Sequence, residues 1–349
     1  MSWDNVTGVS TAYIWTDNPD MTQAYLFANG NHQVKVTVGV SFNLQGEGPT
    51  EDEVKAALSL LNYNTGTGIS HLQSVEQGEY LSVYLPNMPE QPKAMADSSG
   101  KAYQYEFDYY LSSNSDINPN FSSEQVAVLI SYTNADGKTE YSTASDSSRQ
   151  SYVAVAVYPP KKYGMPNSGL TPVIFTIIDD QFKIDETLVS GWINHLYEPS
   201  ATLYGIRIDD SYFIFSQFKV DNSLLAPNAF IQHTITNFSD DNDYNYVFAH
   251  SFFPQENHLY LDNEYDASMY IMSSDSEILV EYTGHFTQQS GEILIARIYN
   301  EVIYAKGGPD AIASSNNKAN ITAYDQFGNA MDILIDGHGD GYPELVSVA

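Results

Sequence analysis

The chain has 349 residues, of which 44 are Asp or Glu and 14 are Lys or Arg, so its net charge at pH 7 is −30. This acidity argues against nucleic acid and anionic membrane surfaces as partners, because both are bound through basic patches. The chain contains no cysteine, which excludes disulfide bonds, thiolate metal sites and cysteine nucleophiles.

The first strong signal is a strand at 33–42. Val34, Val36, Val38 and Val40 alternate there with Lys, Thr, Gly and Ser, the period-two pattern of a strand with one buried face. A single short helix is predicted near 50–62. Thr50 and Glu53 have the spacing of a capping box there, and the apolar residues that follow, Val54, Ala57, Leu58 and Leu61, recur at helical intervals.

Strand patterns continue to the middle of the chain, at 80–85, 103–111, 126–132, 139–143 and 152–158. Asp136-Gly137 is typical of a hairpin turn between the third and fourth of these. The segment 159–171 is rich in Pro and Gly and has no periodicity, which is typical of a linker. We therefore expect two domains, 1–160 and 171–349, the alternative being one domain with a long loop at 159–171.

The second half repeats the strand rhythm. Strands are predicted at 173–178, 202–208, 212–220, 229–236, 246–249, 267–272, 278–282, 293–305, 319–324 and 331–335. The fold class is therefore all-β, with two antiparallel β-sandwich domains of Ig-like or jelly-roll-like type. Residues 212–215 are apolar on both strand faces, which favours a central strand, a subunit interface or a segment that inserts into membrane.

No catalytic residue is predicted, because the nucleophile elbow, the zinc-protease helix motif and the dinucleotide-binding glycine pattern are all missing. None of the eight His residues forms a close ligand pair. The densest acidic cluster, Asp240, Asp241 and Asp243, is interpreted as a solvated loop. The tyrosines at 103, 105, 109 and 110 offer a surface for sugar stacking or, alternatively, fill core and edge positions.

Acidic charge is concentrated in the second half, since residues 1–170 carry 8 basic and 18 acidic side chains and residues 171–349 carry 6 and 26. There, the segment 336–344 (DGHGDGYPE) resembles the acidic calcium loops of thrombospondin-type and FG-GAP repeats. That resemblance implies Ca²⁺ bound by the side chains of Asp336, Asp340 and Glu344 and by the carbonyl of Tyr342. His338 departs from the pattern, since imidazole is a poor calcium ligand. The alternative is an ordinary turn.

The phrases at 29–42 and 319–329 resemble strands and turns of bacterial Ig-like adhesin domains. This resemblance and the missing motifs favour a non-enzymatic bacterial binding or structural protein, adhesin-like, phage-tail-like or self-assembling. Its partner would be a protein or glycan receptor, or further copies of itself. The alternatives are a β-rich receptor-binding or pore-forming toxin and, third, a polysaccharide hydrolase acting through paired carboxylates.

The start of the chain shows no basic region followed by an apolar one, so no Sec-type signal is expected. The longest apolar runs are far below the ~18 residues of a membrane span. We therefore expect a protein without a transmembrane segment that is cytoplasmic or exported by a non-Sec route.

Overall fold

The computed structural model describes most of the chain. The described residues are 2–17, 22–82, 103–113, 123–145, 147–148, 150–190, 195–196, 200–220, 229–238, 244–252, 265–275, 278–288, 290–304, 318–337 and 342–349. They form two compact units. Unit 1 comprises Met1–Lys161 together with Phe327–Asn329, and unit 2 comprises Lys162–Gln326 and Ala330–Ala349.

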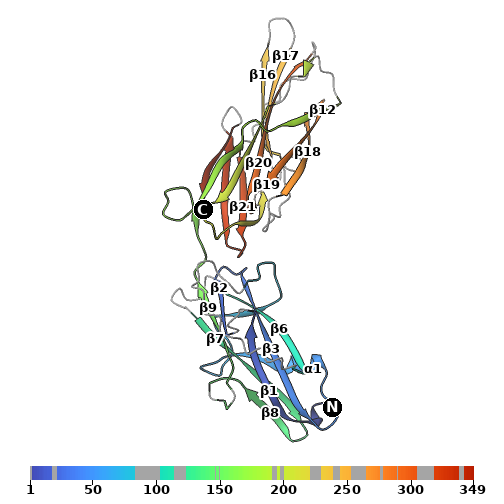
Figure 1. Cartoon of the computed structure of the whole chain (residues 1–349), viewed down its shortest axis with the longest axis vertical. Helices are drawn as coiled ribbons and strands as arrows, with labels where there is room; N and C mark the ends of the chain where they lie inside the picture. The colour runs from blue at the N-terminus through green and yellow to red at the C-terminus, as the bar shows by residue number, and fades with distance from the viewer. Residues whose placement is uncertain are drawn as a thin grey trace. The chain divides into compact units, whose positions relative to one another are not determined.

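Unit 1 contains two β-sheets (Figure 1). The first, sheet A, has the order β1-β3-β6-β5 and is built from β1 (Val6–Thr16), β3 (Gln33–Leu44), β6 (Tyr105–Ser112) and β5 (Gln73–Val75). The second, sheet B, has the order β2-β9-β7-β4, with β8 paired to β7. Its strands are β2 (Gln23–Phe27), β9 (Val153–Tyr158), β7 (Ser123–Asn134), β4 (Leu58–Asn62) and β8 (Gly137–Ser142).

The core of unit 1 lies between these sheets, as the alternation of Val residues in β3 predicts. Val34, Val36, Val38 and Val40 are fully buried, and they belong to one hydrophobic cluster with inward residues of sheet B such as Val128. Burying a Val or Ile side chain contributes about 1.5–3 kcal/mol, so this facing pair of apolar surfaces is the main source of stability for the unit. The other face of sheet A lies outside this core.

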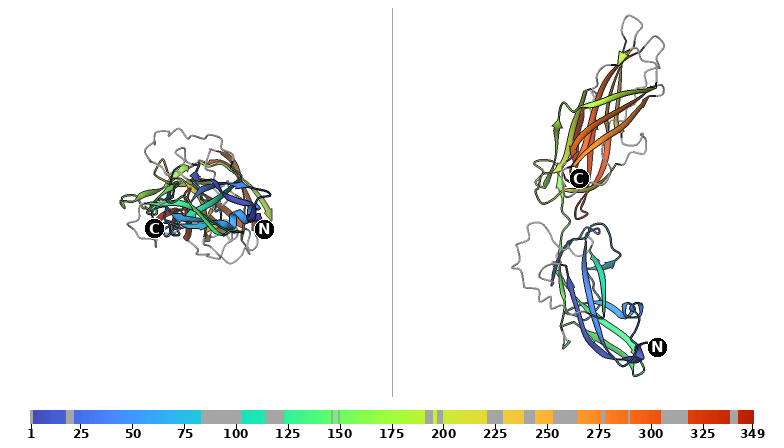
Figure 2. Two further views of the ribbon diagram at one scale, coloured as in Figure 1. Left: turned by 90° about the horizontal axis from the view of Figure 1, so that it is seen from below. Right: turned by 45° about the vertical axis from the view of Figure 1, so that its right-hand side comes forward.

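The helix begins where the capping box predicts. In α1 (Glu51–Ala57), the Thr50 hydroxyl accepts the Glu53 N–H and the Glu53 carboxylate accepts the Thr50 N–H. The helix lies at the side of unit 1 beside β6 and β7 (Figure 2). The predicted extension to residue 62 is wrong, because Leu58–Asn62 forms β4 and pairs with β7. The positions of Leu58 and Leu61 are compatible with either a helix or a strand, and long-range pairing with β7 selects the strand.

Unit 2 contains three sheets. The largest, sheet D, runs β10-β11-β14-β20-β17-β16, with β13 paired to β20. Its strands are β10 (Tyr163–Gly164), β11 (Thr171–Asp179), β13 (His195–Leu196), β14 (Ser200–Ile208), β16 (Ala229–Phe238), β17 (Tyr244–Phe252) and β20 (Ile293–Tyr304).

The two smaller sheets of unit 2 are E (β12-β19-β18) and F (β15-β21-β22-β23). They comprise β12 (Ile184–Ser190), β18 (Tyr265–Asp275) and β19 (Ile278–Gln288), and β15 (Phe215–Val220), β21 (Lys318–Asp325), β22 (Ala330–Gly337) and β23 (Pro343–Val348). Fully buried residues in sheet D, such as Ile206 and Ile293, and in sheet F, such as Phe215 and Ile335, form the described core.

The all-β, sandwich-like fold class is confirmed, and three further details of the prediction are wrong. The sheets are not purely antiparallel, because β2 pairs with β9 and β10 with β11 in parallel. Of the segment predicted as a strand at 80–85, Leu81 makes one isolated bridge to Gln33, and residues 83–85 lie outside the described part of the chain. The division between the two units falls at 161–162, inside the segment 159–171 predicted as a linker, and that segment also contains β10.

The third error concerns residues 212–215. Tyr212 lies in a turn and is about half exposed, and regular pairing starts only at Phe215 in β15. In the described sheet F, β15 is an edge strand and not a central one. Phe213 and Phe215 are buried, so the apolar run places two aromatic anchors in the core. In the described part of the chain, no helix has both the length and the apolar character needed to cross a membrane.

Candidate functional site

The outer face of sheet A carries an ordered set of aromatic and acidic side chains. The strand register places Tyr13, Gly39 and Glu106 in one row across β1, β3 and β6. The next row is Trp15, Thr37 and Asp108. Directly opposed residues in a sheet point to the same face, so aromatic side chains line this face on β1 and carboxylates line it on β6.

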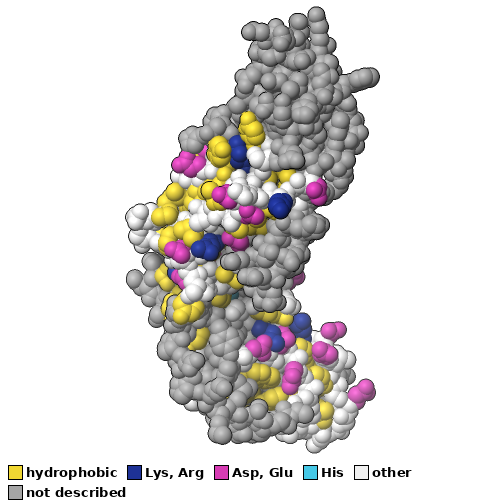
Figure 3. All heavy atoms as spheres, turned by 45° about the horizontal axis from the view of Figure 1, so that its top comes forward, with side chains coloured by type: hydrophobic (Ala, Val, Ile, Leu, Met, Phe, Trp, Pro, Cys, Tyr) yellow, Lys and Arg dark blue, Asp and Glu magenta, His cyan; other side chains and the backbone are white. Residues whose placement is uncertain are grey.

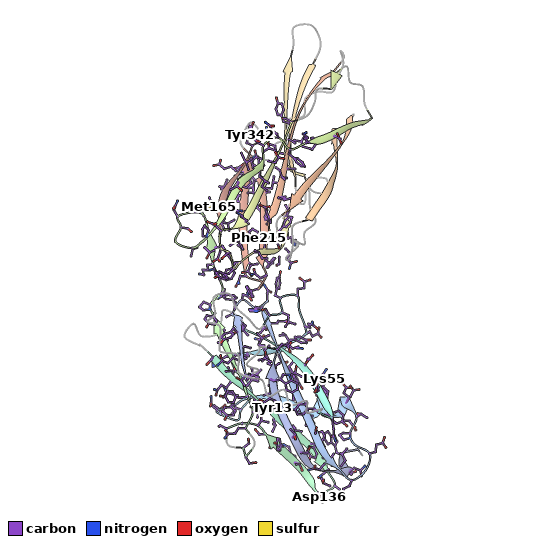
Figure 4. All side chains as sticks on the ribbon, viewed as in Figure 1. Tyr13, Lys55, Asp136, Met165, Phe215 and Tyr342 are labelled. Atoms are coloured by element: carbon purple, nitrogen blue, oxygen red, sulfur yellow. The ribbon has the colours of Figure 1, made fainter. Side chains whose placement is uncertain are left out.

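Three aromatic rings gather on this face, and we call Tyr13, Trp15 and Tyr103 the outer aromatic cluster. The ring centroids of Tyr13 and Trp15 are 6.2 Å apart at an interplanar angle of 27°, and those of Trp15 and Tyr103 are 5.4 Å apart at 22°. Both pairs are stacked, and the cluster lies within unit 1, where Figure 4 labels Tyr13. Tyr13 is 36% exposed, although it lies in the middle of a strand.

Gly39 provides the space for this cluster. A Cβ atom at this position would lie 2.6 Å from Cγ of Tyr103 and 2.9 Å from Cζ3 of Trp15, closer than real Cβ contacts. The two rings therefore rest directly on the backbone of β3. Any larger residue at 39 would displace them, which explains why Gly interrupts an otherwise strong strand sequence.

The polar groups beside the cluster are held by one another. The Thr37 hydroxyl donates to Oδ1 of Asp108 at 2.7 Å, and the Lys35 ammonium lies 3.0 Å from Oδ2 of Asp17 and 3.7 Å from Oδ2 of Asp108. The hydrogen bond to Asp17 is the main reason why the pKa of Lys35 is raised. Lys35 is thus already engaged by two carboxylates.

The pKa of the Tyr103 hydroxyl is also raised, first by partial burial and then by the nearby Tyr13 and Glu106. The hydroxyl therefore stays protonated at neutral pH and can donate a hydrogen bond. An aromatic surface flanked by hydroxyl and carboxylate groups can bind a ligand that has both apolar and hydrogen-bonding faces.

The four tyrosines considered from the sequence divide between the two faces of sheet A. Tyr105 and Tyr109 pair with Val40 and Val36 and pack against the core, and the Tyr105 hydroxyl donates to the Pro49 carbonyl. Tyr110 pairs with Lys35, on the outer face. Sequence reasoning missed Tyr13 and Trp15, although their alternation with the buried Ala12 and Ile14 is a strand signal.

The predicted calcium loop is only partly described. Asp336 and Glu344 are direct cross-strand partners in the β22–β23 pair, so the structure does bring these two carboxylates together. Asp336 also pairs with Lys318 of β21, whose ammonium lies 3.5 Å from its Oδ2. Asp340 and His338 lie outside the described residues. Among the residues that are described, no group of three or more His, Asp or Glu is placed to hold a metal ion.

Tyr342, the fourth residue predicted for this loop, has a packing role. Its ring lies over the guanidinium of Arg297, with the Cζ atom 3.8 Å from the ring centroid. Arg297 is buried, and a cation–π contact to a desolvated guanidinium contributes about 2 kcal/mol. Half of the Tyr342 side chain remains exposed.

Two buried carboxylates elsewhere are bonded within their own unit. In unit 1, the Glu124 carboxylate accepts hydrogen bonds from the Asn62 side chain and from the N–H groups of Ser70 and His71. In unit 2, the Tyr163 hydroxyl donates to the buried carboxylate of Asp325. These hydrogen bonds hold loops and turns in place and satisfy the buried polar groups.

His32 is the most strongly buried histidine among the described residues. Its Nδ1 accepts the Phe27 N–H at 2.9 Å, so Nε2 carries the proton and donates to the Ser82 carbonyl at 3.0 Å. The rings of Phe27 and Phe327 pack against it. Burial lowers the pKa of His32 to about 4, and the hydrogen bond to Ser82 opposes that shift.

A comparison with models of known protein families finds none that matches this chain, and a comparison with curated proteins finds no matching relative.

Proposed function

We propose that the chain is a non-enzymatic binding or structural protein of bacterial type, adhesin-like or phage-tail-like, that acts through its β-sheet surfaces. The observation that carries this proposal is the outer aromatic cluster. Three stacked rings occupy a face of sheet A that the fold itself does not need to cover, because the core lies on the other face. Aromatic side chains fixed on an outer surface are typical of recognition sites.

The bonding of two buried carboxylates, Glu124 and Asp325, favours binding over hydrolysis. Catalysis by a carboxylate pair needs one acid that can donate a proton and one base that faces substrate. Glu124 uses both oxygens to hold the chain at 62–71, and Asp325 accepts from Tyr163 inside unit 2. Both therefore have structural roles that leave their geometry unsuited to a bound substrate.

Self-association is part of the same proposal. β10 pairs only with Thr171 and Pro172 of β11, and no other described strand pairs with that side of β11. Ile177 and Ile178 are 60% and 41% exposed near the end of this strand. Exposed apolar residues on a sheet edge favour pairing with another chain. Calcium at 336–344 remains a second, separate part of the proposal, because Asp336 and Glu344 oppose each other there.

A screen that records both retention and turnover tests the proposed function. The whole chain is applied to immobilised glycans and immobilised surface proteins, and each ligand is analysed afterwards for cleavage. We expect retention on at least one class of ligand, with the ligand chemically unchanged. Release of shortened glycans or peptides at catalytic amounts of protein would contradict the proposal.

A further inference from the structure

We propose that the outer aromatic cluster of Tyr13, Trp15 and Tyr103 is a binding surface for an uncharged polysaccharide. The inference rests on the proposed binding function and names the class of ligand. It starts from the position of the three rings. Tyr13 and Trp15 belong to β1, and Tyr103 lies two residues before β6. Trp15 and Tyr103 are 88 residues apart in the chain, yet their rings are in direct contact.

The cluster is preorganised. Trp15 stacks with both Tyr13 and Tyr103, and Gly39 allows two of the rings to rest on the β3 backbone. Rings held this way lose little side-chain entropy when a ligand binds, so more of the contact energy appears as affinity. If the aromatic side chains served only to cover the exposed backbone at Gly39, one ring would be enough. Tyr13 extends the surface beyond that need, and its side chain is open to solvent.

The surrounding groups match the chemistry of a sugar. A pyranose ring offers a face of C–H groups, which packs on an aromatic ring, and an edge of hydroxyls, which hydrogen-bond to polar side chains. The exposed carboxylates of Glu106 and Asp108 are acceptors for such hydroxyls, and Glu106 shares its row with Tyr13. The Tyr103 hydroxyl, protonated at neutral pH, supplies a donor.

Charge narrows the class of polysaccharide. Lys35 lies on this face and is engaged by Asp17 and Asp108, while Glu106 and Asp108 contribute negative charge. A polyanionic glycan would meet these carboxylates and a chain of net charge −30. An uncharged chain avoids that repulsion and keeps the stacking and hydrogen bonds.

Affinity electrophoresis of the full chain tests the inference, with soluble β-glucan and mannan as neutral probes and alginate as the acidic probe. We expect retardation by at least one neutral probe and none by alginate. Trp15→Ala and Tyr13→Ala are expected to weaken retardation at least about tenfold, which corresponds to about 1.4 kcal/mol. Tyr158→Ala is the matched control, because Tyr158 belongs to the same unit and is 37% exposed on the other sheet.

Gly39→Ala keeps all three rings in the chain while forcing two of them to move, and it should weaken binding as Trp15→Ala does. Circular dichroism identifies any variant that fails to fold, and Tyr13→Ala, at a partly exposed position, keeps the test decisive if Trp15→Ala unfolds. Retardation that Tyr13→Ala and Tyr158→Ala reduce equally would overturn the inference and leave the proposed function standing. The inference would also be overturned if neither neutral probe binds and Tyr13→Ala instead abolishes binding of a protein ligand found in the screen. Absence of binding to every glycan and protein would overturn both.

Discussion

Two buried residues, His32 and Tyr163, make the folding stability of their units depend on pH. His32 is packed between aromatic rings with both nitrogens hydrogen-bonded, and Tyr163 donates to a carboxylate that is itself buried. In both residues the neutral form is favoured, because moving a charge into a poorly solvated site is costly. Each therefore links the stability of its unit to pH, in opposite directions.

Unit 1 is expected to lose stability in acid through His32. Its folded-state pKa of about 4 lies below the unfolded value of about 6.5, so protons bind the unfolded chain first as pH falls. The stabilisation is complete above pH about 6.5 and is lost progressively towards pH 4, by about 3 kcal/mol in all. Urea unfolding at pH 7.5 and 4.5 measures this loss, and His32→Asn should flatten it. The half-buried His71→Asn is the control, and an equal pH slope in His32→Asn and wild type would contradict the assignment.

Unit 2 is expected to lose stability in alkali through Tyr163. Burial raises the pKa of Tyr163 well above its usual range, and the charge of Asp325 and the hydrogen bond to it add to that shift. The unfolded chain ionises near pH 10 while the folded chain does not, so stability is present below pH 10 and falls above it. Tyr163→Phe should cost about 2 kcal/mol at pH 7, because Asp325 loses a donor, and should reduce the fall between pH 9 and 11. Denaturant unfolding checks both effects, with Tyr158→Phe as control.

At the scale of elements, local chemistry predicted how elements begin and long-range pairing decided where they end. The Thr50–Glu53 capping box placed the start of α1, since it is a contact between residues three apart. The end of α1 at Ala57 depends on β7, more than sixty residues later. The outer aromatic cluster was hidden for the same reason, because Trp15 and Tyr103 meet only through the β1-β3-β6 register. Strand β2, which follows β1 in the chain, is also absent from the predicted strands, and it pairs with the distant β9.

The β22–β23 hairpin carries the calcium prediction at this scale. If Ca²⁺ binds Asp336 and Glu344, it has to displace the Lys318 ammonium from Asp336, so Lys318→Met should strengthen binding. Millimolar Ca²⁺ should then raise the melting temperature relative to EDTA, more in Lys318→Met than in wild type, and Asp336→Asn should abolish the shift. Melting curves that coincide in Ca²⁺ and EDTA for both wild type and Lys318→Met would show that this loop is only a turn.

At the scale of the whole molecule, low charge density and high net charge act against each other. Only 17% of residues are charged, yet the net charge is −30. Few ions must be desolvated when a surface is buried, whereas copies of the chain repel one another at long range. On the face drawn in Figure 3, charged side chains are interspersed with hydrophobic and other ones and form no single large patch among the coloured residues.

Self-association is therefore expected to strengthen with ionic strength. At 0.01 M salt the screening length is about 30 Å, and at 0.15 M it is about 8 Å, so repulsion between copies declines steeply over this range. Light scattering across a salt series should show rising molar mass, and Ile177→Ser should reduce it. Leu170→Ser is the control at an exposed Leu of the same unit. A constant monomer mass at every salt concentration would contradict assembly.

The proposed function requires that the chain binds through a fixed surface and leaves its ligand intact. Size-exclusion chromatography with light scattering on a mixture of the chain and a soluble neutral polysaccharide tests this most directly, because it reports bound protein and polysaccharide length together. We expect co-elution at unchanged polysaccharide mass for wild type and Tyr158→Ala, and separate elution for Tyr13→Ala. A polysaccharide that becomes shorter over time while the protein elutes alone would contradict the claim and identify a hydrolase instead.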